Sequence, residues 1–359
     1  MSTHHPAPDD DSIFYRSEGL TLYTGDAAIV LRQLRPGSVD CVVTSPPSWQ
    51  PQYHATDWSG GRAECPHLAN IPTNPTGRVR RCTRCDATRP DAQVGREPTP
   101  VDYVEALRRV FAEIHRVLAP HGTVWVTLGD SYSTNSDGYW CAQPGQHGQP
   151  RYRPATDLPH KNLLGMPWRV ALALQTDGWI LRNAIVWHKP HTTPTPVRDR
   201  LACHHKLIFL LTRSPSYHFD LDPIRAPYTG DRALSRRTHR RGTKPHTATG
   251  TWPPPHTGTT VTGRNPGDVW TIPIHPGTTN HPAPIPTELP AQCIAAGCPP
   301  GGTVLDPFSG TATTGIAAHH LGRSYIGIDT NPNYHTTALH RLDLTPPDHD
   351  RRTHHQTQP

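Results

Sequence analysis

Short apolar runs alternate with amphipathic segments along most of the chain. The clearest run covers residues 39–44, and similar runs predict strands at 123–128, 180–187, 206–212, 303–305 and 324–328. Apolar residues at helical spacing predict helices from Thr99, which can cap the first of them, to Leu118, over 164–176 and near 313–321. Strands that alternate with helices predict an α/β fold with a mainly parallel sheet.

The last strand–helix–strand unit has the features of a nucleoside-cofactor site. Its turn reads Asp306-Pro307-Phe308-Ser309-Gly310-Thr311-Ala312-Thr313, so a ligand can approach the backbone and the amides of the next helix can bind a carboxylate. The next strand ends in Asp329, which suits two ribose hydroxyls. The turn lacks the Gly-x-Gly-x-x-Gly pattern of dinucleotide sites, which favours a compact ligand with an amino-acid end, such as S-adenosylmethionine. An ordinary βαβ turn is the alternative.

A second candidate site follows the strand at 39–44, where the chain reads Ser45-Pro46-Pro47-Ser48-Trp49. Ligands of open α/β sheets bind outside the carboxyl ends of the strands. Two prolines hold the backbone extended and remove two N–H donors, so carbonyl groups remain as acceptors. The Ser45 side chain and the Pro46 carbonyl can accept hydrogen bonds from the exocyclic amine of cytosine or adenine, whose nitrogen can then attack a sulfonium methyl group. A proline-rich strand exit without a catalytic role is the alternative.

In this order, the segments resemble the amino-group DNA methyltransferases of the circularly ordered class, in which the catalytic motif precedes the cofactor motif. Residues 44–49 resemble the family's Ser-Pro-Pro-aromatic motif, and residues 306–315 resemble its Asp-Pro-Phe-x-Gly-x-Gly-Thr-Thr motif. The similarity extends over about residues 20–340 and includes segments at 24–26, 165–169, 178–190, 205–213, 268–270 and 281–290. It implies a Rossmann-like methyltransferase sheet, S-adenosylmethionine as cofactor, and double-stranded DNA with a flipped target base as substrate.

The resemblance also implies roles for individual residues. It predicts a catalytic site of Ser45, Pro46, Pro47 and Trp49. It predicts a cofactor site, with one acid on the adenine and one on the ribose, of Asp26, Asp306, Phe308, Gly310, Thr311, Thr313 and Asp329. Two positions depart from the family pattern: Ala312 replaces a glycine of the cofactor turn, and Ser48 replaces the aromatic residue that stacks on the flipped base. We expect Trp49 or Tyr53 to take over the stacking.

Ser45 bears on the choice of the target base. Serine at this position resembles the cytosine-N4 members of the family, whereas adenine-N6 members more often carry Asp or Asn, so we expect cytosine N4 and keep adenine N6 as the alternative. Because Ser48 replaces the stacking aromatic, a sequence-specific DNA-binding protein with weakened catalysis is a third interpretation. The motif order disfavours a methyltransferase of RNA or protein. No segment resembles a nuclease motif, so restriction would need a separate endonuclease.

The insert at residues 50–97 has the spacing of a structural zinc knuckle. Cys65 and His67 form one pair, and Cys82 and Cys85 form a second pair after 14 intervening residues. Four such ligands would complete a tetrahedral site, so the zinc would be structural. Reduced thiols without a metal are the alternative.

Charge points to a nucleic-acid partner. The net charge is +6 at pH 7 and arginine far outnumbers lysine. Residues 222–265 have few large aliphatic side chains, lie where the family places its target-recognition region, and include Arg236, Arg237, Arg240 and Arg241. A basic segment that becomes ordered on DNA accounts for this composition. A solvated linker, or an arginine-rich genome composition, is the alternative.

The predicted organisation has five parts. These are an N-terminal tail at 1–19, a catalytic half at 20–221 with the insert at 50–97, the basic target-recognition segment at 222–265, a cofactor-binding half at 266–343, and a C-terminal tail at 344–359. No run approaches the roughly 20 apolar residues of a membrane span, and the first residues lack an apolar signal core. We therefore expect a cytoplasmic enzyme without a membrane partner.

Overall fold

The computed structural model describes residues 12–49, 65, 79–81, 84–85, 88–90, 94–95, 97, 99–133, 158–159, 161–192, 198–227, 263–274 and 285–344. Within these residues, one large sheet has its strands in the order β1 (Ile13–Ser17), β2 (Leu20–Thr24), β11 (Ser324–Asp329), β10 (Thr303–Asp306), β3 (Val39–Thr44), β6 (Leu118–Leu128), β8 (His205–Thr212), β7 (Ile180–His188) and β9 (Val269–Thr271).

The centre of the sheet is parallel, as the alternation of strands and helices predicted. The strands from β2 to β6 in this order all run parallel to their neighbours. β8 is antiparallel to both β6 and β7, and β1 is antiparallel to β2. The carboxyl ends of β2, β11, β10, β3 and β6 therefore share one edge of the sheet, where ligands of such folds bind.

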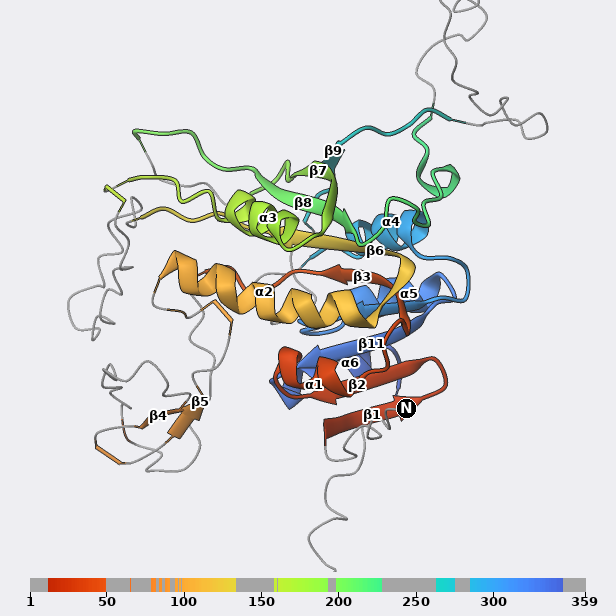
Figure 1. Cartoon of the computed structure of the whole chain (residues 1–359), viewed down its shortest axis with the longest axis horizontal. Helices are drawn as coiled ribbons and strands as arrows, with labels where there is room; N and C mark the ends of the chain where they lie inside the picture. The colour runs from red at the N-terminus through yellow and green to blue at the C-terminus, as the bar shows by residue number, and fades with distance from the viewer. Residues whose placement is uncertain are drawn as a thin grey trace, which may run out of the picture.

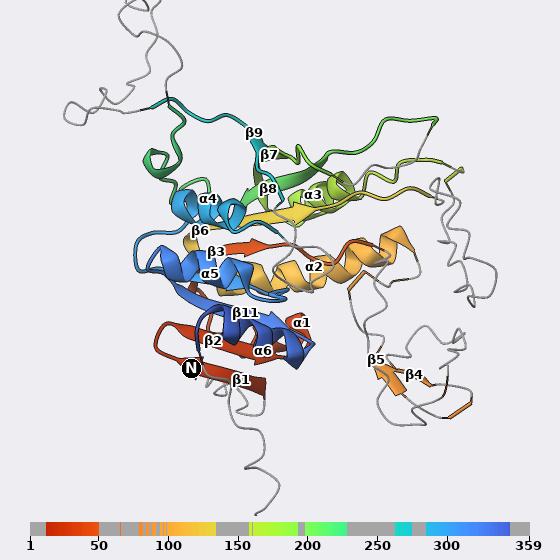
Figure 2. The ribbon, with the colours of Figure 1, turned by 180° about the vertical axis from the view of Figure 1, so that it is seen from behind.

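Helices cover both faces of the sheet (Figures 1 and 2). One face carries α1 (Ala27–Gln33), α2 (Pro100–Val117) and α3 (Met166–Thr176), and the other carries α4 (Glu288–Gly297), α5 (Thr313–His320) and α6 (Pro332–Arg341). Each face has its own cluster of buried apolar side chains, one including Leu31 and Phe111 and the other Ile294 and Leu339. No helix among the described residues is long and apolar enough to cross a membrane.

The sequence predicted the start of α2 correctly, but not the segment that follows its end. Thr99 accepts a hydrogen bond from the Asp102 amide at 3.1 Å, and Pro100 occupies the first turn, as predicted. The helix ends at Val117, but β6 begins at once with Leu118 rather than at residue 123. Pro120 and His121 are exposed residues within this strand. The sequence around them therefore lacks the apolar run of a buried strand and resembles a turn.

The prediction of an N-terminal tail over residues 1–19 was wrong for residues 13–17, and residues 1–11 lie outside the described residues. β1 covers Ile13–Ser17 and forms an edge of the main sheet through its pairing with β2. The strand is short and partly exposed, so its sequence alone does not distinguish it from a tail. In the insert, β4 (Val79–Arg81) and β5 (Thr88–Pro90) form a separate two-stranded antiparallel sheet. Beyond a short 3-10 turn, η2 (Asp222–Ile224), residues 228–262 of the basic segment lie outside the described residues.

Candidate active site

The two predicted motifs meet at the carboxyl edge of the sheet through one buried carboxylate. Strands β3 and β10 are neighbours, so Ser45 and the cofactor turn leave the sheet side by side. The Thr44 hydroxyl, at the end of β3, donates to Asp306 at 2.6 Å, and the Thr314 hydroxyl, in α5, donates to the other carboxylate oxygen at 2.8 Å. Asp306 therefore connects the catalytic strand with the helix that follows the cofactor turn.

Asp306 is enclosed by the protein. Its side chain is 4% exposed, and it also accepts the Phe308 amide at 3.1 Å. Burial raises the pKa of Asp306 to about 6, although the three hydrogen bonds oppose this shift. Because both carboxylate oxygens are bound within the chain, this residue positions the two motifs.

The cofactor turn adopts the left-handed backbone that its family resemblance requires. Gly310 has φ 49° and Ala312 has φ 55°. The second value explains why a glycine is usual at position 312, since the left-handed region costs a residue with a Cβ about 1–2 kcal/mol. Thr313 begins α5, and no side chain caps this helix in the described part of the chain. Its first amides are thus suited to the carboxylate of an amino-acid ligand.

Asp329 holds the same turn from the neighbouring strand. One oxygen of its carboxylate accepts the Gly310 amide at 2.9 Å, and the other accepts the Asn331 amide at 2.8 Å. The Gly25 amide donates to the Asp329 carbonyl at 2.9 Å, which brings the start of α1 to this edge. There Asp26 caps α1 by accepting the Ile29 amide at 3.1 Å. Asp26, the acid predicted to contact the adenine, thus follows β2, and Asp329, the acid predicted to contact the ribose, ends the adjacent strand β11.

The Thr24 hydroxyl is one of the buried polar atoms at this edge that have no partner in the described structure. Thr24 ends β2 opposite Asp329, and its hydroxyl is buried without a hydrogen bond among the described residues. A buried hydroxyl of this kind is costly unless a ligand or water binds it. Together with the uncapped α5 and the bare turn at Gly310, it shows that the residues present fit a nucleoside with an amino-acid end.

Arg341 was not predicted from the sequence, although it holds two of the predicted cofactor residues. Its guanidinium, at the end of α6, donates to the Thr311 carbonyl at 2.7 Å, the Thr311 hydroxyl at 2.8 Å and the Thr313 hydroxyl at 3.1 Å. Its position 28 residues beyond the turn gave no signal in the sequence. The side chain fixes the outer side of the cofactor turn.

The predicted catalytic motif, residues 45–49, is held from both of its sides. The Ser45 hydroxyl is half-buried and donates to the Thr127 carbonyl of β6 at 3.3 Å. The hydroxyl of Tyr103, from α2, donates to the Pro47 carbonyl at 2.9 Å, and Pro46 is buried. The backbone after β3 is therefore fixed before any substrate arrives.

The Trp49 side chain lies in the core and not at the position expected of a residue that stacks on a base. Its side chain is 1% exposed, lies in the cluster on the α2 face, and donates from Nε1 to the Glu97 carbonyl at 3.0 Å. The ring consequently offers no free face to a base and instead anchors the end of the motif. Tyr53, the second stacking candidate, lies outside the described residues.

The predicted zinc and DNA-contacting residues are only partly described. Cys85 lies in the turn between β4 and β5, and Cys65 is described without its neighbours. His67, Cys82, Arg236, Arg237, Arg240 and Arg241 lie outside the described residues. The described part of the chain contains no group of three or more potential metal ligands. Zinc and the arginine contacts remain predictions.

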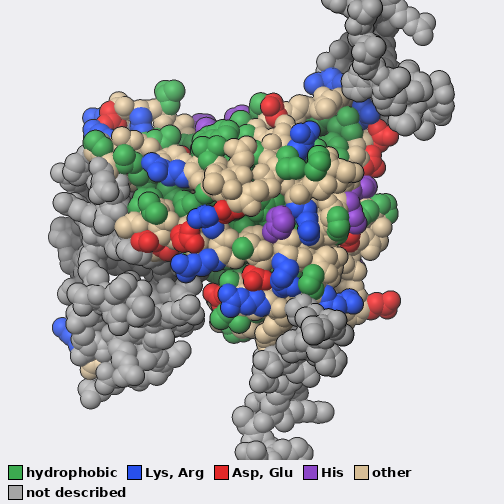
Figure 3. Space-filling model, in the orientation of Figure 1, with side chains coloured by type: hydrophobic (Ala, Val, Ile, Leu, Met, Phe, Trp, Pro, Cys, Tyr) green, Lys and Arg blue, Asp and Glu red, His purple; other side chains and the backbone are tan. Residues whose placement is uncertain are grey.

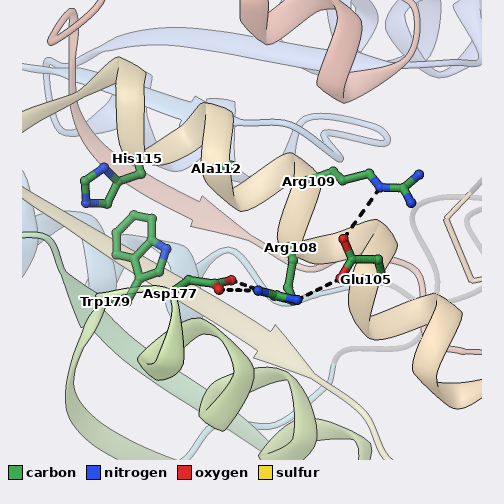
Figure 4. A pocket seen from close by; sticks show the side chains of 7 residues that line it. All are labelled: Glu105, Arg108, Arg109, Ala112, His115, Asp177 and Trp179. Atoms are coloured by element: carbon green, nitrogen blue, oxygen red, sulfur yellow. Dashed lines mark hydrogen bonds and ion pairs between the residues drawn. The ribbon is translucent and has the colours of Figure 1, made fainter.

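An open hollow between α2 and α3 lies away from both motifs (Figure 4). Its wall includes Arg108, which pairs with Asp177 and Glu105, and His115, whose ring meets Trp179 edge-on at 5.0 Å. The charges are thus largely satisfied within the wall. On this face, basic and acidic side chains are interspersed (Figure 3), which does not give the continuous positive surface that DNA attracts. The carboxyl edge of the sheet is the better candidate.

Comparison with known proteins agrees with this geometry. Residues 39–340 match the family model N6_N4_Mtase, described as DNA methylase. Type II methyltransferase M.Cfr9I of Citrobacter freundii is 34% identical over 90% of this chain and 88% of its own length. Type II methyltransferase M.SmaI of Serratia marcescens is 32% identical over 89% of this chain and 90% of its own length.

A solved structure shares the fold. The structure of PvuII DNA methyltransferase (cytosine-N4-specific) aligns with a TM-score of 0.57 over 92% of this chain and 89% of its own length, at 16% identity. The family model and the two relatives show that this chain belongs to the N6_N4_Mtase family of S-adenosylmethionine-dependent DNA methyltransferases.

Proposed function

We propose that this protein transfers a methyl group from S-adenosylmethionine to the exocyclic N4 amine of cytosine at a specific site in double-stranded DNA. The observation that carries the proposal is the Thr44–Asp306–Thr314 connection, which holds Ser45 beside the cofactor turn. The names of the Type II relatives support a role in restriction and modification, with a separate endonuclease as partner. Serine at position 45, which resembles the cytosine-N4 members of the family, favours cytosine over adenine.

The hydrogen bonds of the catalytic motif suit an amine substrate. Because the Ser45 hydroxyl donates its hydrogen bond to the Thr127 carbonyl, the lone pairs of its oxygen remain as acceptors. The Pro46 carbonyl provides a second acceptor, and Tyr103 fixes the next peptide. Two acceptors on one amine favour a tetrahedral nitrogen with a localised lone pair. S-adenosylmethionine supplies the electrophilic methyl group, and the methylated amine then loses a proton to water.

We propose that the cofactor is held by Asp26, Phe308, Gly310, Thr311, Thr313 and Asp329, with Asp306 as the positioning residue beneath them. Asp329 is the most informative member, because its carboxylate already fixes Gly310 and would bind the ribose hydroxyls as well.

Asp329→Ala is expected to weaken binding of S-adenosylmethionine by about 1–3 kcal/mol, because charge-assisted hydrogen bonds are lost. Isothermal titration calorimetry measures the affinity. Glu18→Ala is the matched control, since this exposed acid lies in the turn between β1 and β2. That turn is at the amino end of β2, away from the carboxyl ends where the cofactor site is proposed. Equal affinities of the two variants would remove Asp329 from the cofactor site.

Mass spectrometry of nucleosides tests the reaction itself. DNA incubated with the protein and S-adenosylmethionine is digested, and N4-methylcytosine is the expected product. N6-methyladenine would show the alternative target base, which has support in the DNA adenine methyltransferase YhdJ of Escherichia coli, 24% identical over 92% of this chain. Retained DNA binding without a methylated nucleoside would show a DNA-binding protein that has lost catalysis.

The basic segment is proposed to contact the phosphates of DNA. Wild-type affinity for duplex DNA should fall steeply with salt, since arginines displace condensed counterions. Replacing Arg236, Arg237, Arg240 and Arg241 by glutamine should flatten the slope of log affinity against log salt by up to about 3.6, the value for four phosphate contacts. Fluorescence anisotropy over a salt series measures this slope. A slope identical to wild type would place the segment away from the phosphates.

A further inference from the structure

Lys206 lies at the same sheet edge as Ser45 and has no role in the site derived so far. In the antiparallel pair of β6 and β8, Leu128 lies opposite Leu207. The next position along each strand therefore brings Lys206 beside Gly129, where β6 leaves the sheet. Ser45 binds the same end of β6 through Thr127. Lys206 and the catalytic motif thus approach one place from two neighbours of β6.

The side chains of Lys206 and Ser48 both approach the bare backbone of Gly129. A Cβ added to Gly129 would lie 3.1 Å from the Ser48 hydroxyl oxygen and 3.7 Å from Cε of Lys206. A larger residue at position 129 would separate these side chains. Ser48 stands where related enzymes carry an aromatic residue, so the stem of Lys206 lies beside the position that such a ring would occupy.

The ammonium group of Lys206 lacks an acidic partner. None of the ion pairs in the described part of the chain includes it. The charge that acts on it most is another cation, Lys189, at the end of β7. Burial and this repulsion lower the pKa of Lys206 to about 8, so the group is still mostly protonated at neutral pH. A cation in this setting gains most from an oxygen acceptor that arrives with the substrate.

We propose that Lys206 is a specificity-determining residue that donates a hydrogen bond to the O2 carbonyl of the flipped cytosine, while Ser45 and the Pro46 carbonyl bind its N4 amine. The inference rests on the proposed function. Cytosine presents an amine and a carbonyl on one edge, whereas adenine has no exocyclic carbonyl oxygen. The charged hydrogen bond also contributes to binding of the base at a site where Ser48 provides no stacking surface.

The variant Lys206→Met tests this assignment, because methionine keeps much of the apolar stem and removes the donor. Two duplexes serve as probes: one carries the target sequence, located by sequencing of methylated DNA, and one has an abasic site in place of the target cytosine. We expect Lys206→Met to bind the cytosine duplex about 10- to 100-fold more weakly than wild type. Binding of the abasic duplex, which keeps every phosphate, and of S-adenosylmethionine should be unchanged.

Lys161→Met is the matched control, since Lys161 is an exposed lysine paired with Asp199. This variant should bind each of the two duplexes with the affinity of the wild-type protein. An equal loss by Lys206→Met on both duplexes would mean a phosphate contact and would overturn the proposal, as would wild-type affinity for the cytosine duplex. If wild-type protein forms N6-methyladenine, the proposed function has failed on its own account. If it forms N4-methylcytosine and Lys206→Met keeps its affinity, only the inference about Lys206 has failed.

Discussion

Ser45→Ala is expected to abolish methyl transfer while the fold and the binding of S-adenosylmethionine are retained. The Ser45 oxygen is one of the two acceptors proposed for the target amine, and its hydroxyl already donates a hydrogen bond to the Thr127 carbonyl. Removing one preorganised group that acts on the reacting atoms typically lowers kcat by about 100- to 1000-fold. Alanine leaves Pro46 and Pro47 in place, so the backbone of the motif should keep its conformation.

Single-turnover methylation of duplex DNA measures the effect on the chemical step. Ser38→Ala is a suitable control, because Ser38 is a partly exposed serine just before β3, at the opposite end of that strand, and its hydroxyl donates to the Arg35 carbonyl. Its turnover should match wild type. If Ser45→Ala also methylates at the wild-type rate, the catalytic assignment of residues 45–49 is wrong, and the amine must be bound elsewhere.

Short-range signals explain which parts of the fold the sequence predicted. The start of α2 is encoded by Thr99, Pro100 and Asp102, which act within one turn of helix, and the structure confirms it. β1 was not predicted because it is held by tertiary contacts: it pairs with β2, Ile13 packs against one core cluster, and Phe14 and Tyr15 pack against the other. An edge strand of this kind is defined by tertiary contacts and carries little pattern of its own.

In the candidate site too, residues within a contiguous motif were predicted, and residues that reach the motif through tertiary packing were not. Both motifs are contiguous, so their residues were visible in the sequence and their strands place them at one edge. Arg341 and Tyr103 reach the motifs only because α6 and α2 pack beside them, and no local spacing predicts such contacts. The role expected of Trp49 could not be judged from the motif alone, because its ring enters the core cluster on the α2 face.

Asp306→Ala is expected to cost about 2–5 kcal/mol of folding free energy and to abolish methylation. The Thr44 and Thr314 hydroxyls and the Phe308 amide would lose their buried acceptor, and each unsatisfied group costs about 1–3 kcal/mol before the structure relaxes. The catalytic strand and the cofactor turn would lose their direct connection. Urea denaturation measures the stability, and calorimetry measures the accompanying loss of S-adenosylmethionine binding. Wild-type stability of this variant would contradict the role of Asp306.

Asp306→Asn separates the hydrogen bonds from the charge. The amide oxygen can still accept from Thr44 and Phe308, so this variant should be far more stable than the alanine variant. Burial raises the pKa of Asp306 from 3.8 to about 6, so between these values the folded chain holds a proton that the unfolded chain releases. The carboxyl therefore stabilises the fold more as pH falls from about 7 to about 4. The stability of wild type relative to Asp306→Asn should rise over that interval, and a difference that is constant with pH would show that the carboxyl ionises normally in the folded chain.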